Sequence, residues 1–103
     1  MIDYTVRDVL CDMGAEEAAL FENPNFDAAI VGVTEDGRAV YDYELMLQLL
    51  CMEDSMTTEE AADFLSYNTI RSIPYAGEHA PVVMTTVYQN PEFEKAFDRG
   101  ETL

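Results

Sequence analysis

The amino-acid sequence predicts an α+β fold, in which a small three-stranded sheet packs with about four helices in the order α(α)ββααβ. Two capping boxes followed by apolar residues at helical spacing predict helices. An Asp-Gly turn between two apolar runs predicts a hairpin, and a later run rich in β-branched residues supplies the third strand. Hydrophobic residues make up 49% of the 103 residues, which is enough for one core and excludes a disordered chain.

The first helix is predicted to start at Thr5-Val6-Arg7-Asp8, where the threonine hydroxyl can accept from the backbone and an acid stands three residues on. Apolar side chains follow at helical spacing, at Val6, Val9, Leu10 and Met13. Gly14 suits the end of this helix. Residues 15–21 have high helix propensity and predict a second short helix, after which Asn23-Pro24-Asn25 breaks the chain.

The clearest β signal lies between residues 28 and 41. The run at 28–33 is apolar and partly β-branched, and the run at 39–41 returns after a turn at Glu35-Asp36-Gly37-Arg38. Because the first run is apolar on both faces, we expect it to form a central strand or to be covered by helices.

Asp42 is predicted to cap the next helix, which Glu53-Asp54-Ser55 ends. Its apolar stripe is formed by Leu45, Met46, Leu49, Leu50 and Met52. Thr57-Thr58-Glu59-Glu60 is the second capping box and opens a helix that is expected to end near Ile70. Pro74 forbids its continuation, and residues 75–78 are expected to form a loop.

Residues 81–88 predict the third strand, with proline at its first position. We expect one domain over residues 1–90, followed by a polar tail over residues 91–103 that can form a short helix at 92–97.

Charge is the strongest signal in the composition. Asp and Glu number 21 against five Lys and Arg, which gives a formal net charge of −16. Residues 8–36 hold eight acids and residues 42–63 hold seven, and neither stretch contains a base. Such a chain should repel nucleic acid and anionic membranes and attract basic proteins. Two interpretations stay open, since acidity can serve recognition or can confer solubility alone.

The motifs of catalysis and metal binding are absent from the sequence. Neither a Gly-rich phosphate loop nor a calcium loop occurs, so we expect no enzyme activity, no cofactor and no metal. His79 is the single histidine; a small hydrolase or metal-dependent enzyme that uses it with nearby acids is the least favoured hypothesis. Cys11 and Cys51 are far apart and are expected to be reduced.

Localisation is expected to be cytoplasmic. No apolar run approaches the ~20 residues that cross a bilayer, and the first residues lack the basic and apolar regions of a signal peptide. Met46, Met52 and Met56 could form an adaptable apolar patch for a homodimer.

The segment 67–77 is the most unusual in composition, because it combines aromatic and polar residues with a base. Tyr67, Arg71 and Tyr75 could form a binding epitope or the rim of a pocket. The alternative is structural: Asn68 and Arg71 would satisfy loop carbonyls and carboxylates while the tyrosines pack over the sheet edge.

Four stretches together resemble a group of small bacterial proteins of uncharacterised function that are encoded on prophages and other mobile elements. They are FDAAIVGVTEDGRAVYDY at 26–43, YNTIR at 67–71, PYAG at 74–77 and APVVM at 80–84. The resemblance implies a setting in which small acidic proteins inhibit host defence, including anti-CRISPR proteins and DNA mimics. It brings no catalytic residues, and the chain after Tyr88 lies outside it.

The first functional hypothesis is an acidic protein-binding module, an inhibitor of the anti-CRISPR or DNA-mimic type, in the bacterial host cell. It would dock on a basic nucleic-acid-binding protein such as a CRISPR effector and would bind no nucleic acid itself. The carboxylates predicted to imitate phosphates are those of Glu16, Glu17, Glu35, Asp36, Glu53, Asp54, Glu59 and Glu60. The alternative is a non-enzymatic regulatory or housekeeping interaction protein, with contacts at Tyr67, Arg71 and Tyr75 and acidity that only confers solubility.

Overall fold

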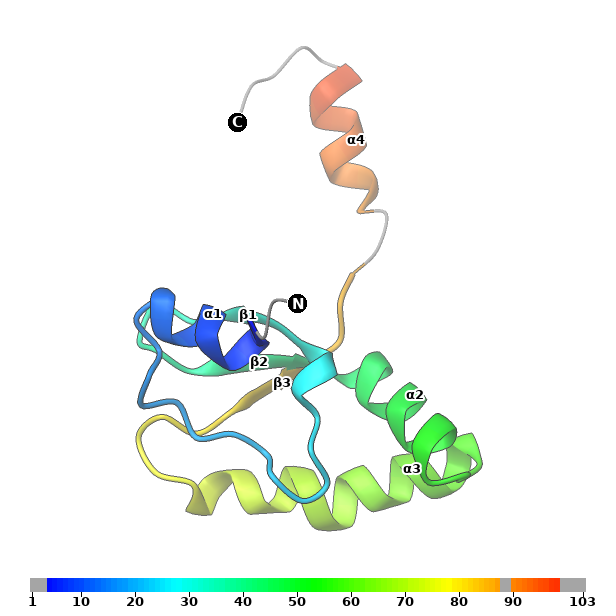
Figure 1. Ribbon diagram of the computed structural model, residues 1–103. Coiled ribbons are helices and arrows are strands. Elements are labelled where there is room, and N and C mark those ends of the chain that lie inside the picture. Colours follow the sequence, from blue (N-terminus) through cyan, green and yellow to red (C-terminus); the bar gives the residue numbers. More distant parts are fainter. Residues whose placement is uncertain (1–3, 88–89, 99–103) are drawn as a thin grey trace.

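The computed structural model describes residues 4–87 and 90–98 and has the α+β fold that the sequence predicts (Figure 1). Its helices and strands are α1 (Val6–Asp12), β1 (Ile30–Val33), β2 (Ala39–Asp42), α2 (Tyr43–Glu53), α3 (Thr58–Phe64), β3 (Val82–Met84) and α4 (Pro91–Asp98). The sheet is mixed, because β1 pairs with β2 antiparallel and β2 pairs with β3 parallel. The parallel pairing requires a crossover, which α2 and α3 provide.

The predicted caps form at the starts of three helices. Thr5 and Asp8 make a reciprocal capping box, in which the Thr5 amide donates to Asp8 Oδ2 at 2.9 Å. Thr57 and Glu60 repeat this arrangement, with 2.9 Å from the Thr57 amide to Glu60 Oε1. Asp42 caps α2 by accepting from the second amide of that helix at 3.0 Å. These side chains satisfy backbone donors that a helix start leaves without intrahelical partners.

The Asp-Gly hairpin turn is confirmed. The Thr34 amide donates to the Arg38 carbonyl at 2.8 Å, and the Gly37 amide donates to the Thr34 carbonyl at 3.0 Å. Gly37 has a φ of +82°, which glycine adopts without the steric penalty of a side chain. The turn therefore closes the hairpin from local sequence, and the register of β1 on β2 shifts further along, between Ile30 and Gly32.

Of the two placements predicted for the first strand, central or covered by helices, the central one is wrong. β2 occupies the centre, with Ala39 and Tyr41 both 0% exposed, while β1 is an edge strand and Val31 is 47% exposed. Helix α1 runs beside β1, so the helix covers only part of the apolar surface of that strand. The third strand also differs from its prediction, since β3 covers Val82–Met84 alone; Tyr88 lies outside the described residues.

The second short helix predicted at 15–21 does not form. A turn at 16–17 leads into an extended segment whose amides bond to distant parts of the chain. The Ala19 amide donates to the His79 carbonyl at 3.0 Å, and the Phe21 amide donates to the Tyr41 hydroxyl at 3.1 Å. The Phe21 ring packs on Tyr41 with a centroid distance of 4.8 Å. These tertiary contacts outweigh the helix propensity of the segment.

The helical segment that begins with α3 continues further than predicted. It passes into a π-helical stretch at Leu65–Thr69 and a 3₁₀-helical stretch at Ile70–Tyr75, so the expected end near Ile70 is wrong. Pro74 lies near the end of the 3₁₀ stretch, where hydrogen bonds reach back three residues rather than four. Leu65 and Thr69 are buried, so the π-helical stretch packs against the core.

One core joins these elements. Its largest fully buried apolar side chains are Phe26, Tyr41, Met46, Leu50 and Leu65. Helix α2 contributes buried side chains to the core, as predicted. One position differs, because Met52 is 77% exposed and Leu47 is buried instead. Burial raises the pKa of the Tyr41 hydroxyl above its ordinary value, so this group stays neutral where it accepts from Phe21.

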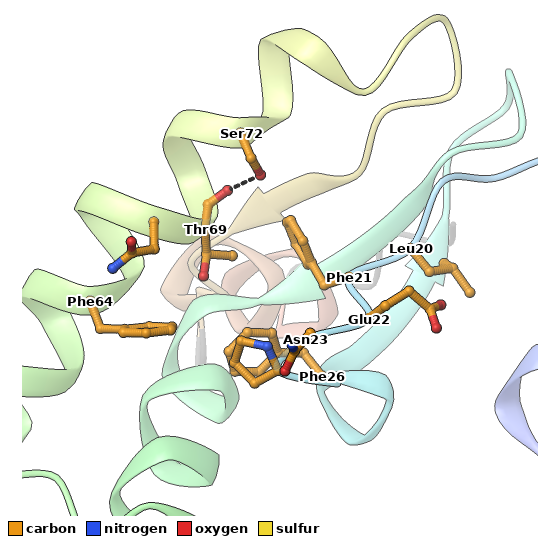
Figure 2. A pocket seen from close by; sticks show the side chains of 10 residues that line it. Leu20, Phe21, Glu22, Asn23, Phe26, Phe64, Thr69 and Ser72 are labelled. Carbon is orange, nitrogen blue, oxygen red and sulfur yellow. Dashed lines mark hydrogen bonds between the residues drawn. The ribbon is translucent and has the colours of Figure 1, made fainter.

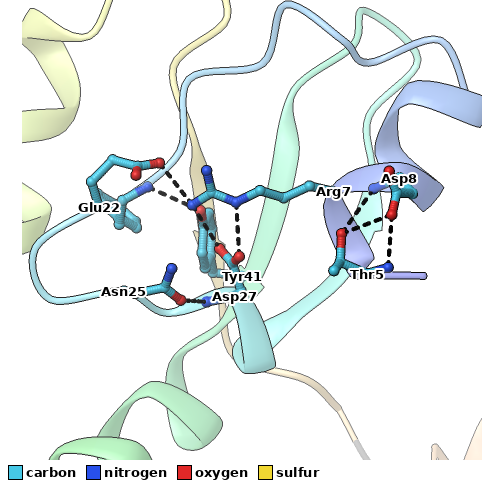
Figure 3. A network of polar contacts seen from close by, with 8 residues as sticks. Thr5, Arg7, Asp8, Glu22, Asn25, Asp27 and Tyr41 are labelled. Carbon is cyan, nitrogen blue, oxygen red and sulfur yellow. Dashed lines mark hydrogen bonds and ion pairs between the residues drawn. The ribbon is translucent and has the colours of Figure 1, made fainter. Parts of the chain in front are cut away.

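Arg7 joins α1 to the segment that precedes β1 (Figure 3). Its Nε lies 2.8 Å from Asp27 Oδ2, one terminal nitrogen lies 3.2 Å from Asp27 Oδ1, and the same nitrogen lies 2.7 Å from Glu22 Oε1. These hydrogen bonds, first to Asp27 and then to Glu22, raise the pKa of the Arg7 guanidinium. Asp27 is further held by its own amide, which donates to Asn25 at 2.8 Å.

Near the carboxyl end, α4 spans Pro91–Asp98, where a short helix at 92–97 is predicted. It stands away from the body of the protein in Figure 1. Within the described residues, no helix has both the length and the apolar character that a membrane crossing requires.

Replacing Arg7 by alanine is expected to lower the free energy of unfolding by about 1–2 kcal/mol, because the two-pronged contact to half-buried Asp27 is lost. Arg71→Ala is the matched control, since it also removes one positive charge but breaks no ion pair between described residues. Urea denaturation of both variants measures the difference. Equal losses would mean that total charge, not the Asp27 contact, governs stability.

Candidate functional site

The eight carboxylates predicted to bind a partner are all exposed, but the structure separates them into two groups. The hairpin pole consists of Glu16, Glu17, Glu35 and Asp36, and the corner pole consists of Glu53, Asp54, Glu59 and Glu60. In Figure 1 the tip of the β1–β2 hairpin and the connection from α2 to α3 lie at opposite ends of the molecule. The predicted residues therefore do not form one continuous surface.

The hairpin pole is assembled from three loops. A Cβ built on Gly37 would lie 3.6 Å from the Gly14 carbonyl oxygen and 3.8 Å from His79 Cδ2. The turn at 16–17 and the loop at 77–79 thus both lie beside the hairpin turn. Within the pole, the Thr34 hydroxyl donates to the Asp36 carboxylate and lowers the pKa of Asp36. Asp36 therefore keeps its charge to lower pH than an ordinary aspartate.

The corner pole is built where α2 ends and α3 begins. Glu53 is the last residue of α2 and Asp54 follows it, whereas Glu59 and Glu60 lie in the first turn of α3. Ser55, with a φ of +55°, reverses the chain between the two helices. Four carboxylates consequently project from a span of eight residues.

None of these eight carboxylates is ion-paired to a base in the part of the chain that the structure describes. The ion pairs there join Arg7 to Glu22 and Asp27, and Lys95 to Glu92. Arg38 instead uses its Nε to donate to the Ala80 carbonyl at 2.7 Å. Arg38 and His79 lie close enough to Asp36 that their charges lower its pKa further. The two poles still carry more acids than bases, which produces a negative potential around them.

Helices α1 and α2 each end on an acid, which opposes their dipoles. Asp12 closes α1 and Glu53 closes α2, and neither helix has a base in its last turn. The partial negative charge at a helix carboxyl end makes each such acid unfavourable by about 0.3–1 kcal/mol. Asp12 accepts a hydrogen bond from the Tyr4 hydroxyl, which compensates for its position, whereas Glu53 has no such bond among the described residues.

A second exposed feature is the set of Tyr67, Arg71 and Tyr75, named here the tyrosine–arginine strip, which lies in the π-helical and 3₁₀-helical segment after α3. Tyr67 is 67% exposed and Tyr75 is 87% exposed, so the alternative in which the tyrosines pack over the sheet edge is wrong. Arg71 has no ion pair or side-chain hydrogen bond among the described residues, so its predicted structural role is wrong as well. Residues 64–77 contain no acid.

A pocket of about 320 Å³ lies next to this strip and was not predicted from the sequence (Figure 2). It is lined by Leu20, Phe21, Glu22, Asn23, Pro24, Phe26, Phe64, Asn68, Thr69 and Ser72. The rings of Phe21 and Phe26 meet at 89° with centroids 6.1 Å apart. The two segments that form the pocket are some forty residues apart in the chain, so no local pattern could indicate it.

The remaining candidates are dispersed. His79 is half-buried beside the hairpin turn, and across residues 4–87 and 90–98 no three Asp, Glu, His or Cys side chains converge in a geometry that could hold a metal ion. Cys11 and Cys51 are both free thiols. Met46 is fully buried, so the predicted three-methionine dimer patch does not form.

Comparison with known proteins adds no relative: a scan of protein-family models, a search of curated proteins and a search of solved structures each return no match. The two acidic poles, the tyrosine–arginine strip and the pocket are therefore interpreted from their own chemistry.

Glu53→Lys is expected to stabilise the fold relative to Glu59→Lys by about 1 kcal/mol. The two variants change the net charge equally and lie at the same corner, but Glu53 ends α2 whereas Glu59 starts α3. The relief of overall repulsion is thus shared, and only the helix dipoles distinguish them. Urea midpoints at low ionic strength measure this; a reversed or absent difference would contradict the dipole argument.

Proposed function

We propose that the protein is a non-catalytic binding protein that docks through an acidic pole on a basic nucleic-acid-binding protein. The observation that carries this proposal is that all eight carboxylates of the two poles are exposed and that none of them forms an ion pair among the described residues. The resemblance to mobile-element proteins extends the proposal to an inhibitor of the anti-CRISPR or DNA-mimic type, acting in the bacterial cytoplasm on a target such as a CRISPR effector.

In this docking, carboxylates of the protein would take the places of nucleic-acid phosphates. A groove that binds nucleic acid presents Lys and Arg side chains to a row of phosphates, and a row of fixed carboxylates can occupy the same positions. Long-range attraction between opposite charges would accelerate encounter, and it would weaken as salt screens the charges. Occupation of the groove would exclude the nucleic acid, which gives inhibition without any chemical step.

The separation of the poles favours contact through one pole at a time. The four acids of the corner pole come from one helix–helix connection, so they lie close together in the chain. The hairpin pole depends on three loops that meet at Gly37. We therefore expect one pole to carry most of the effect on a given partner.

Matched neutralisation of the poles tests the proposal. One variant carries Glu16→Gln, Glu17→Gln and Glu35→Gln, and the other carries Glu53→Gln, Asp54→Asn and Glu59→Gln, so both lose three negative charges. Affinity capture from a bacterial lysate with stepwise salt elution would first identify the partner, and surface plasmon resonance would then give rates. Neutralising the contacting pole should lower the association rate about tenfold and flatten its salt dependence.

The matched variant at the other pole should have a much smaller effect, because its carboxylates act only through the screened distant field. Capture of no basic protein at low ionic strength, or an affinity that does not change with salt, would contradict the proposal.

The tyrosine–arginine strip supports a second candidate function, a regulatory or housekeeping interaction in which acidity confers solubility only. Exposed Tyr67, Arg71 and Tyr75 have the residue types that dominate binding energy at protein interfaces.

If this second function holds, Arg71→Ala should weaken partner binding at least tenfold through faster dissociation, while both pole variants bind as the wild-type protein does. Arg38→Ala provides a control at which one positive charge is lost outside the strip. Surface plasmon resonance with the captured partner separates the two functions, since loss at the poles alone would exclude the second.

A further inference from the structure

We propose that the pocket between residues 20–24 and 64–72 is the anchor site for one tyrosine or tryptophan side chain of the protein partner. The inference rests on the proposed function in one respect, that the chain works by binding a protein. It adds the chemical identity of the partner group that enters this pocket. The acidic poles do not determine that identity.

The walls of the pocket suit an aromatic ring. Phe26 is 1% exposed and forms its base, while half-buried Phe21 and Phe64 line its sides (Figure 2). Phe21 and Phe26 already pack edge to face, with their rings at 89° to each other. Aromatic rings pack well against such pairs, since the positive edge of one ring meets the negative face of another. A volume of about 320 Å³ leaves room for a single large side chain.

The polar groups around these walls can accept a hydrogen bond from the occupant. Ser72 already donates its hydroxyl proton to the Thr69 carbonyl at 2.7 Å, so its oxygen remains an acceptor. The side-chain amides of Asn23 and Asn68 make no hydrogen bond within the described part of the chain, and each offers a carbonyl oxygen. A phenol O–H or an indole N–H can donate to these oxygens while its ring stays between the phenylalanines.

The local charge disfavours an anionic occupant. Glu22 lines the pocket, and its carboxylate shares the Arg7 guanidinium with Asp27, so these three groups keep one net negative charge. An inserted carboxylate would also meet the field of a chain with a net charge of −16. A neutral aromatic group with one donor avoids this repulsion, and it avoids the cost of removing a charged group from water, which an inserted arginine or lysine would incur.

The surroundings of the pocket have the composition of an interface centre. Residues 64–77 contain no acid, although acids make up about a fifth of the chain. Tyr67 and Tyr75 are exposed on the same helical segment. Protein interfaces are depleted in Asp, Glu and Lys at their centre and enriched in Tyr and Arg, and energetically dominant residues tend to face one another. The pocket would thus provide short-range specificity, whereas the poles provide long-range attraction.

Titration of the full-length protein with small aromatic probes, followed by amide NMR shifts, tests the inference without knowledge of the partner. The probes p-cresol and indole should give saturable shifts at the amides of Phe64, Asn68 and Ser72. Toluene, which lacks the donor, should bind about three- to tenfold more weakly, as expected for the loss of one hydrogen bond. Phenylguanidinium, which mimics arginine, should bind more weakly than p-cresol.

Two pocket-filling variants, Ser72→Phe and Asn68→Phe, should abolish the saturable shifts. Ser66→Phe is the control, because Ser66 is exposed on the same helical segment but does not line the pocket. Two independent filling variants guard against misfolding of either one, which the amide spectra would reveal. The inference is overturned if no probe saturates, if a filled pocket still binds, or if phenylguanidinium binds more tightly than p-cresol.

The same titration on the Glu53→Gln, Asp54→Asn, Glu59→Gln protein separates this inference from the proposed function. Probe binding should be unchanged there, because none of those residues lines the pocket. Loss of partner capture with intact probe binding would implicate the poles, whereas intact salt-sensitive capture without probe binding would reject the anchor site alone.

Discussion

The rest of the structure depends on the contacts that the buried side chain of Tyr41 makes from the central strand. Its ring is fully enclosed, and its hydroxyl accepts from the amide of Phe21, a residue twenty positions earlier. That bond and the ring contact hold the segment after α1 in an extended path across the core. Phe21 then meets Phe26 at a right angle, and the two rings become walls of the pocket. A core contact thereby determines the geometry of a surface site.

Repulsion between carboxylates is the second constraint. The chain has only five bases against 21 acids, and the described bases serve distinct purposes. Arg7 fastens α1 to the segment before β1, Arg38 binds a backbone carbonyl, and Arg71 stays exposed beside the pocket. Most of the remaining acids lie on the exterior, where water and salt screen their repulsion. Asp42 is buried at 2% exposure, and the Glu44 amide and the Thr86 hydroxyl donate to its carboxylate. The resulting surface has two negative ends, and the helical segment at 64–77 contains no acid.

The features that were predicted correctly share one property: the residues that cause them are neighbours in the sequence. Each capping box spans four residues, and the Asp-Gly turn spans four, so their hydrogen bonds close within the motif. The exposure of the acids was predictable for a similar reason, since burial of an unpaired carboxylate is costly anywhere. The failures all involve distant partners. Residues 15–21 do not form a helix, because amides of this segment donate to the Tyr41 hydroxyl and the His79 carbonyl. Strand β1 lies at the edge of the sheet, because β3 pairs with the other side of β2.

By itself, the sequence determined the fold class, the helix starts, the hairpin and an acidic exterior, because these follow from local hydrogen bonding, periodicity and charge. Only the tertiary structure decided that the carboxylates form two poles, that Tyr67 and Tyr75 face solvent, and that residues 20–24 and 64–72 enclose a pocket. The physical reason is that each of these depends on which distant segments the core brings together. Packing makes that choice through the combined shapes of many side chains, and no short pattern encodes it.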